Sequence, residues 1–195
     1  MFEKMSVEQY CQTLASSSPT PGGGSALAIV GAFACSLVEM SASVTLAKLK
    51  DDEAEKREYL QREITSIERA RKCLYKLSDD DAEAYGNIVA ARKLAKDTDE
   101  NIKRRTAELQ KAFHKATLVP LDVMNLCRDV LKRAQTRVLP QLSKYIVSDC
   151  EIGVSLLKTV IEHSVQNVYA NTVFIHDDSL KRSLEAQARN IAADL

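Results

Sequence analysis

Residues 21–50 have the sequence PGGGSALAIVGAFACSLVEMSASVTLAKLK, and this stretch decides the fold that the sequence predicts. From Ser25 to Lys50 no proline interrupts it, and its composition and spacing favour one long helix. Small residues fall on every side of that helix, so neighbouring helices can pack closely all round it. They are Ala28, Gly31, Ala32, Ser36 and Ala42. We therefore expect it to be the central helix of a helical bundle.

The same helix is long enough to cross a bilayer, and it is also apolar enough, because residues 25–47 contain a single charged residue, Glu39. A carboxylate near the middle, the abundance of Ala, Ser and Gly, and the lack of aromatic belts argue against a membrane span. The segments around it have the pattern of amphipathic helices in water-soluble proteins. We expect a soluble protein without membrane association.

Helical periodicity continues on both sides of this stretch. Before it, Ser6 and Gln9 form a capping-box pattern that predicts a helix to about Ala15, followed by a loop over residues 16–24. After it, residues 52–95 contain no proline and carry one apolar stripe, which predicts one long helix or two nearly collinear ones. The stripe consists of Leu60, Ile64, Ile67, Leu74, Leu77, Ala84 and Ile88.

Prolines and caps divide the second half of the chain. A helix is predicted over about residues 99–117, and Pro120 suits the first turn of another that extends to about residue 138. Ser148 with Glu151 forms a second capping-box pattern, which predicts a helix to about residue 175; residues 177–179 then start a final helix. No segment has a convincing strand alternation. The prediction is an all-α, single-domain helical bundle over residues 1–195, with about six to eight helices.

Composition excludes several functional classes. Twenty-seven basic residues balance 27 acidic ones and tryptophan is absent, which argues against a nucleic-acid-binding surface. The five cysteines contain no CxxC pair, and the three histidines have no ligand-like spacing to them. We therefore predict no metal site, and reduced thiols in a cytoplasmic protein.

The segment Pro21-Gly22-Gly23-Gly24-Ser25 is the sharpest local feature. Glycines let a backbone approach a ligand and adopt positive φ, and these three end at a helix N-terminus, whose free N–H groups attract negative charge. A Walker loop is excluded because the Gly-Lys-Ser/Thr ending is missing. A flexible connector between two helices is an equally good interpretation of the segment itself.

Two carboxylates lie in apolar surroundings. Asp81 continues the register of Leu77 and Ala84, so its side chain is predicted to point toward the packed face. Burial raises the pKa of a carboxyl group toward the range useful for acid/base work, although a structural ion pair is as good an explanation. Glu39, alone in the small-residue helix, has the same two interpretations.

Polar residues of the helix that starts near Ser148 form two further candidates. Asn167 and Asn171 are spaced i, i+4, so both amides face one direction and can orient a polar heterocycle or simply satisfy each other. Asp149 follows Ser148 in the first turn, where an acidic residue ordinarily stabilises a helix.

The order of these features resembles the cyclodeaminase/cyclohydrolase domain family, which includes formiminotetrahydrofolate cyclodeaminases and stand-alone methenyltetrahydrofolate cyclohydrolases. The matching segments extend from about residue 6 to residue 178. They are residues 19–25 (PTPGGGS) with the following helix to Glu39-Met40, residues 81–85 (DAEAY), residues 119–121 (VPL), residues 147–149 (VSD), and Asn167-Val168 with Asn171.

This resemblance implies an all-α homodimer with a folate site near the glycine loop and the dimer interface. It implies an enzyme that acts on the carbon bridging N5 and N10 of tetrahydrofolate without a metal or redox cofactor. Asp81 is then expected to be the catalytic acid/base and Asp149 its electrostatic partner. The expected substrate-binding residues are Gly22, Gly23, Gly24, Ser25, Glu39, Asn167 and Asn171.

The expected reaction is that of a cyclodeaminase, which converts 5-formiminotetrahydrofolate into 5,10-methenyltetrahydrofolate and ammonia. A cyclohydrolase, which adds water to 5,10-methenyltetrahydrofolate to give 10-formyltetrahydrofolate, is an alternative that the sequence does not separate from it. A non-catalytic folate-binding module is a third possibility. It is favoured by Leu142-Ser143, which stand where the family often has a Gly-Asn pair.

Overall fold

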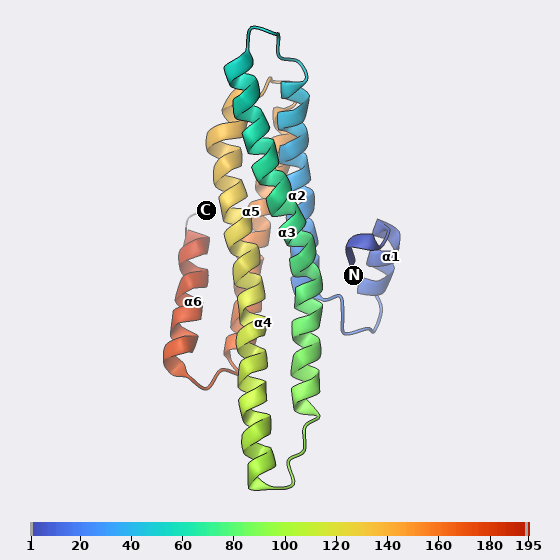
Figure 1. The fold of residues 1–195 in the computed structure, drawn as a ribbon, viewed down its shortest axis with the longest axis vertical. Helices are drawn as coiled ribbons and strands as arrows, with labels where there is room; N and C mark the ends of the chain where they lie inside the picture. The colour runs from blue at the N-terminus through green and yellow to red at the C-terminus, as the bar shows by residue number, and fades with distance from the viewer. Residues whose placement is uncertain (1, 194) are drawn as a thin grey trace.

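The computed structural model describes residues 2–193 and 195, and within them every regular element is helical. Six α-helices follow in order (Figure 1). They are α1 (Val7–Leu14), α2 (Gly23–Leu46), α3 (Ala54–Arg92), α4 (Asp99–Arg133), α5 (Val147–Thr172) and α6 (Asp178–Ala193). The predicted all-α fold is confirmed, and residues 52–95 form one helix rather than two.

Helices α2 to α5 form an up-down-up-down four-helix bundle (Figure 1). α2 packs on α3 and α5, and α4 closes the bundle by packing on the same two helices. α6 lies outside it against α4 and α5, while α1 lies beside α2, separated from it by an apolar groove of about 490 Å³. α3 and α4 continue beyond the start of α2 and the end of α5 (Figure 1).

Close packing of α2 explains its small residues. A Cβ atom on Gly31 would lie 3.0 Å from Cys127 Sγ, and one on Gly153 of α5 would lie 3.0 Å from the Ala34 carbonyl oxygen. Gly153 thus lets the backbones of α2 and α5 approach closely, and Gly31 makes room for the Cys127 side chain of α4. Within one chain, however, α2 forms a corner of the bundle: its inner side is buried, whereas Phe33 and Met40 on the outer side are exposed.

α2 has the length and composition of a membrane-spanning helix, as the sequence indicated. In the structure, 44% of its most apolar window is buried against other parts of the chain. Glu39, in the second half of α2, pairs with Arg71 of α3, with Oε2 2.9 Å from the arginine Nε. The apolar character of this helix thus serves in part for packing within the bundle.

The predicted starts of α1 and α6 are confirmed, whereas the capping box predicted at Ser148 is wrong. Ser6 and Gln9 form a reciprocal capping box at α1, and Asp177 accepts hydrogen bonds from the N–H groups of residues 179 and 180 at α6. Ser148, by contrast, lies inside α5, whose N-cap residue is Ile146 without a side-chain cap. The Ser148–Glu151 capping box is therefore absent.

Pro120 does not start a helix, contrary to the prediction, because α4 runs through it without a break. A proline inside a helix has no N–H to donate, which leaves the carbonyl four residues earlier without its helical donor. Here that carbonyl belongs to Ala116, and it accepts a hydrogen bond of 3.1 Å from Asn171 Nδ2 of α5. A side chain from a neighbouring helix thus replaces the missing helical bond.

The far end of α4 is fixed by a buried carboxylate. Past Arg133 the helix widens into one π-helical turn (Ala134–Val138), followed by a 3₁₀ turn at Leu139–Gln141. Glu63 of α3, only 5% exposed, accepts hydrogen bonds from Arg133 at 2.8 Å and from Arg137 at 3.0 Å. This carboxylate joins α3 to both the last turn of α4 and the π-helical turn.

Candidate active site

A cavity of about 200 Å³ lies where the loop before α2 meets the last third of α3, the middle of α4 and the end of α5. Segments far apart in the sequence converge on it, and six of the nine site residues predicted from sequence are among them. The lining residues are Pro19, Thr20, Gly22, Gly23, Gly24, Asp81, Tyr85, Ile88, Ala116, Asn167, Ala170 and Asn171. The structure thus brings together the glycine loop, the acidic residue and both amides.

The carboxylate of Asp81 sits on the N-terminus of α2. Its Oδ2 accepts a hydrogen bond of 2.9 Å from the Ser25 backbone N–H, and the Ser25 hydroxyl lies 3.0 Å away. That hydroxyl also lies 2.8 Å from the Ser78 carbonyl oxygen, so its single proton has two acceptors within reach and Ser25 is held from two sides. Ser25 is fully buried and positions the carboxylate from behind the cavity, which it does not line.

Burial raises the pKa of Asp81 above its ordinary value, although the two hydrogen bonds from Ser25 act in the opposite direction. A carboxyl group with a raised pKa exchanges its proton closer to neutral pH than an exposed aspartate does. This is the property that a general acid/base requires. Asp81 lies on the packed face of α3, as its register predicted.

Gly24 is required for space rather than for backbone conformation. No glycine in the described residues has a positive φ, so that part of the prediction is wrong. A Cβ atom on Gly24 would instead overlap Asp81 Oδ1 and lie 2.7 Å from Asp81 Cγ. The glycine thus creates the place that the carboxylate occupies.

This geometry predicts a sharp difference between neighbouring glycines. Gly24→Ala should force the Asp81 carboxyl group off the Ser25 N–H and lower turnover of the folate substrate that the resemblance implies by about tenfold or more, because a displaced acid/base loses its alignment with the proton. Gly23→Ala is the matched control, since a Cβ atom there meets nothing within 4 Å. Steady-state kinetics of both variants tests this. Equal losses in the two variants would show that the loop tolerates no side chain for some other reason.

The two amides of α5 lie on the opposite wall of the cavity from the glycine loop's helix. Asn171 Nδ2 donates to the Ala116 carbonyl oxygen at 3.1 Å and to the Asn167 carbonyl oxygen at 3.2 Å. Asn167 Nδ2 is buried and has no hydrogen-bond partner among the described residues. The i, i+4 spacing therefore places both amides at one cavity, as predicted.

Several lining residues were not identified from the sequence. Tyr85 stands one turn after Asp81 on α3, and its ring is 39% exposed at the cavity. That i, i+4 spacing was a usable signal. Ile88 continues the same face, and Ala116 and Ala170 keep the cavity open because their side chains are small.

Two of the predicted site residues, Glu39 and Asp149, lie elsewhere in the chain. Glu39 is paired with Arg71, and along α2 it lies 15 residues, or about 22 Å, from Gly24. Asp149 begins α5, and 18 residues of helix, or about 27 Å, separate it from Asn167. Neither residue joins the cavity of its own chain. Leu142 and Ser143 lie just before α5, also outside the cavity lining.

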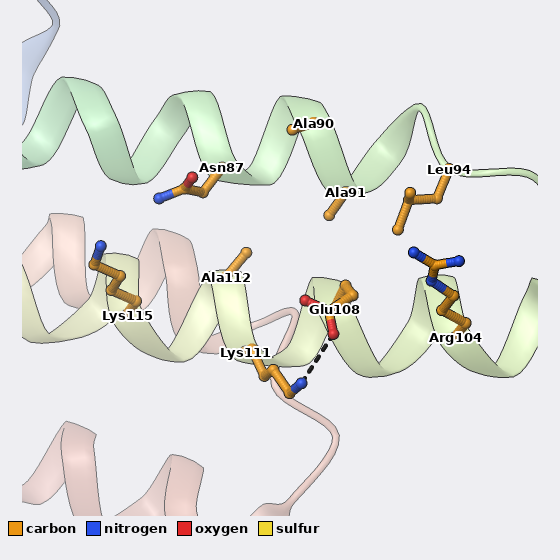
Figure 2. A pocket seen from close by; sticks show the side chains of 9 residues that line it. All are labelled: Asn87, Ala90, Ala91, Leu94, Arg104, Glu108, Lys111, Ala112 and Lys115. Atoms are coloured by element: carbon orange, nitrogen blue, oxygen red, sulfur yellow. Dashed lines mark hydrogen bonds and ion pairs between the residues drawn. The ribbon is translucent and has the colours of Figure 1, made fainter.

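A groove of about 420 Å³ follows one helical turn beyond the cavity, between the extended parts of α3 and α4 (Figure 2). Asn87, Ala91 and Leu94 line one side, as Figure 2 shows. The other side carries three cations and one anion of α4, namely Arg104, Lys111, Lys115 and Glu108. Lys111 pairs with Glu108 at 2.8 Å and Lys115 with Glu83 at 3.0 Å. The groove is net basic in a chain whose charges balance.

Comparison with known proteins agrees with this geometry. Residues 6–190 match the family model described as formiminotransferase-cyclodeaminase. The chain belongs to the formiminotransferase-cyclodeaminase family. The family predicted from the sequence is thereby confirmed, and the match includes every residue of the cavity.

Relatives within this family carry both of the activities considered above. The chain is 35% identical to a methenyltetrahydrofolate cyclohydrolase of Methylorubrum extorquens, over 88% of this chain and 81% of that protein. It is 29% identical to the formimidoyltransferase-cyclodeaminase of Rattus norvegicus, over 90% of this chain but 32% of that protein. The chain therefore spans about a third of the latter enzyme.

A solved structure of the family confirms the fold. The formiminotetrahydrofolate cyclodeaminase of Thermotoga maritima superposes with a TM-score of 0.86 at 27% sequence identity. The superposition covers 100% of this chain and 91% of that one.

Proposed function

We propose that this chain is a folate one-carbon enzyme whose active site is the cavity around Asp81. The observation that carries the proposal is the convergence of one half-buried carboxylate, a helix N-terminus with free N–H groups and two amides on a single cavity. These groups suit a cationic amidinium carbon next to a polar heterocycle. The cavity is smaller than a folate, and the adjoining basic groove offers cations to the carboxylates of the glutamate portion.

The cyclodeaminase reaction is the first assignment. The formimino group of 5-formiminotetrahydrofolate is protonated on its terminal nitrogen. N10 attacks the carbon of this group, which forms the N10–C bond. The Asp81 carboxylate removes the proton from N10 and delivers it to the amino group, so that the C–N bond breaks and ammonia leaves. The bridging carbon remains as the methenyl cation, and Asp81 returns to its ionised state. One carboxylate therefore serves as base and then as acid.

The cyclohydrolase reaction is the second candidate, favoured by the 35% identity to the Methylorubrum enzyme. Here the Asp81 carboxylate takes a proton from the water that attacks the methenyl carbon. It then gives that proton to N5 as the N5–C bond breaks, and the hydroxyl proton is released to solvent. Neither reaction changes an oxidation state, so the proposal includes no redox cofactor. Asp81 carries the proton transfers in both reactions, and no step of the proposal is assigned to a metal.

A homodimer is part of the proposal, because the outer face of α2 carries apolar residues that the chain itself leaves exposed. Phe33, near the middle of α2, is 45% exposed, and the apolar groove beside α1 continues this face. If two copies pack their α2 helices antiparallel about Phe33, Glu39 lies level with residue 27 of the partner subunit, about 5 Å along the helix from its glycine loop.

The same packing accounts for Asp149. Gly153 contacts α2 near Ala34 and Val38, and α5 runs antiparallel to α2, so Asp149 lies still further toward the C-terminal end of α2. Across the proposed two-fold axis that end lies opposite the glycine loop of the partner subunit. Asp149 and Glu39 would thus complete the partner's cavity rather than their own, and their distance from Asp81 within one chain is then expected.

Complementation between subunits tests this arrangement. Asp81→Asn and Asp149→Asn should each be nearly inactive alone, whereas mixed dimers contain one site with both carboxylates. Random reassortment should therefore restore about a quarter of the wild-type activity. Light scattering should give about twice the chain mass for each variant. A mixture that stays inactive would place Asp149 outside the shared site.

The assay that separates the candidate functions offers both folates to the wild-type protein. Ammonia release from 5-formiminotetrahydrofolate reports the cyclodeaminase, and loss of methenyl absorbance reports the cyclohydrolase. Binding of a folate analogue without turnover of either substrate would leave the third candidate, a non-catalytic folate-binding module. Absence of binding as well would remove the folate assignment.

A further inference from the structure

We infer that Pro120 is a positioning residue of the folate site: its missing N–H leaves the Ala116 carbonyl free to hold the Asn171 amide in one orientation. The inference rests on the proposed function for the identity of the ligand, but its geometry rests on the structure alone. Pro120 is buried within α4 and does not line the cavity. It acts through Ala116 and Asn171, which do.

The orientation of the Asn171 amide follows from its neighbours. Both hydrogen-bond partners of its Nδ2 are carbonyl oxygens, of Ala116 and of Asn167, and an oxygen in that place would face two acceptors. Both amide protons are therefore used within the protein. Asn171 Oδ1 is left for the cavity, where it can only accept a hydrogen bond.

Asn167 offers the opposite polarity one turn earlier on α5. Its Nδ2 is buried and has no hydrogen-bond partner in the part of the chain that the structure describes, and a buried donor of this kind costs free energy until an acceptor arrives. The cavity thus presents a donor at Asn167 next to an acceptor at Asn171. This pair complements the 2-amino-4-oxopyrimidine edge of a pterin, which carries a carbonyl acceptor beside N–H donors.

Pro120→Ala separates this role from a structural one. An alanine at position 120 regains the N–H, which donates to the Ala116 carbonyl oxygen and competes with Asn171. Replacing a helix-interior proline by alanine should leave the helix as stable or make it more stable. If Pro120 is merely structural, the KM of the Pro120→Ala variant should be unchanged. If Pro120 positions Asn171, the KM for the folate should rise about three- to tenfold, which is the effect expected from the loss of one oriented hydrogen bond.

A double-mutant cycle makes the test specific. In the Asn171→Ala background Pro120→Ala should cause no further rise in KM, because the amide that it releases is already gone. Pro140→Ala is the matched control, since Pro140 lies in the 3₁₀ turn after α4, away from the cavity. An unchanged KM in Pro120→Ala, or an equal rise in both backgrounds, would overturn the inference.

A second measurement needs no ligand. In protein labelled with ¹⁵N-asparagine, the Asn171 side-chain NH₂ protons should exchange slowly with water in the wild type and at least tenfold faster in Pro120→Ala. Equal exchange rates would overturn the geometry. If the wild type instead turns over neither folate while the exchange rates differ as expected, the proposed function and the pterin complement fail and the positioning by Pro120 stands.

Discussion

Asp81→Asn should reduce turnover of the folate substrate by about 10²–10⁴-fold while the protein folds, dimerises and binds a folate analogue. Losses of this size are typical when a general acid/base is removed. Asparagine keeps the shape of the side chain, and its Oδ1 can still accept the Ser25 N–H at the start of α2. Steady-state kinetics measure the loss of turnover, and titration with a folate analogue measures the binding that should remain.

The raised pKa of Asp81 fixes the sign of two pH effects. Activity that needs the carboxylate form should fall as the pH drops through this pKa, at a higher pH than for an ordinary aspartate. Because the folded-state pKa is raised, ionised Asp81 lowers the free energy of unfolding at neutral pH, and this penalty disappears below the unfolded-state pKa. Asp81→Asn removes the penalty, so its thermal midpoint at pH 7 should equal or exceed that of the wild type.

The neighbouring residue supplies a control for this variant. Asp80 is also partly buried on α3, but it does not line the cavity. Its Oδ2 lies 4.0 Å from Lys76 Nζ, which is a long distance for an ion pair. Asp80→Asn should therefore keep near-normal turnover. If Asp81→Asn unfolds, Asp81 is a purely structural cap of α2. If the variant keeps normal turnover, another residue is the catalytic acid/base.

Replacing both arginines that hold Glu63 should cause the largest loss of stability. The Glu63 side chain is only 5% exposed. In the double variant Arg133→Met/Arg137→Met its carboxylate should remain buried but lose both cations that pair with it. Breaking a buried ion pair in this way costs about 3–5 kcal/mol, and we expect the lower part of that range because both arginines are partly exposed. Urea unfolding gives the free energy directly.

Adding Glu63→Met to that variant tests the cause. The triple variant carries no unpaired charge, and buried ion pairs replaced by apolar residues of similar volume are often as stable as the original. Most of the lost free energy should return. Glu68→Ala on the same helix is a surface control, because Glu68 pairs with exposed Lys72 one turn away. If the triple variant is no more stable than the double, packing rather than charge sets the loss.

Elements of the fold that depend on local pattern were predictable from the sequence. The apolar stripe gave α3 and the inward register of Asp81, and the Ser6–Gln9 capping box gave α1. The inward register and the capping box follow from periodicities that neighbouring residues alone determine. The convergence of the glycine loop and the i, i+4 amides on one cavity was instead implied by the family resemblance.

Features that depend on other segments were not predictable. Pro120 indicated a helix start, and only the amide of Asn171, 51 positions later in the sequence, lets α4 continue through it. The role of Gly24 depends on Asp81 of another helix, so the sequence suggested backbone freedom where the structure requires space. Asp149 was assigned to the cavity by resemblance, and the length of α5 places it at the opposite end.

The topology of the bundle also determines when the active site can form during folding. Contacts between α2 and α3, α3 and α4, and α4 and α5 join successive helices and need only short loops to close. The contact of α2 with α5 joins segments more than a hundred residues apart, and the cavity lies where the ends of these two helices meet. A chain with almost all of its helix formed can therefore still lack a binding site. If folate binds at this cavity as proposed, its binding should report the long-range closure of α2 against α5, whereas far-UV circular dichroism should report the formation of the helices.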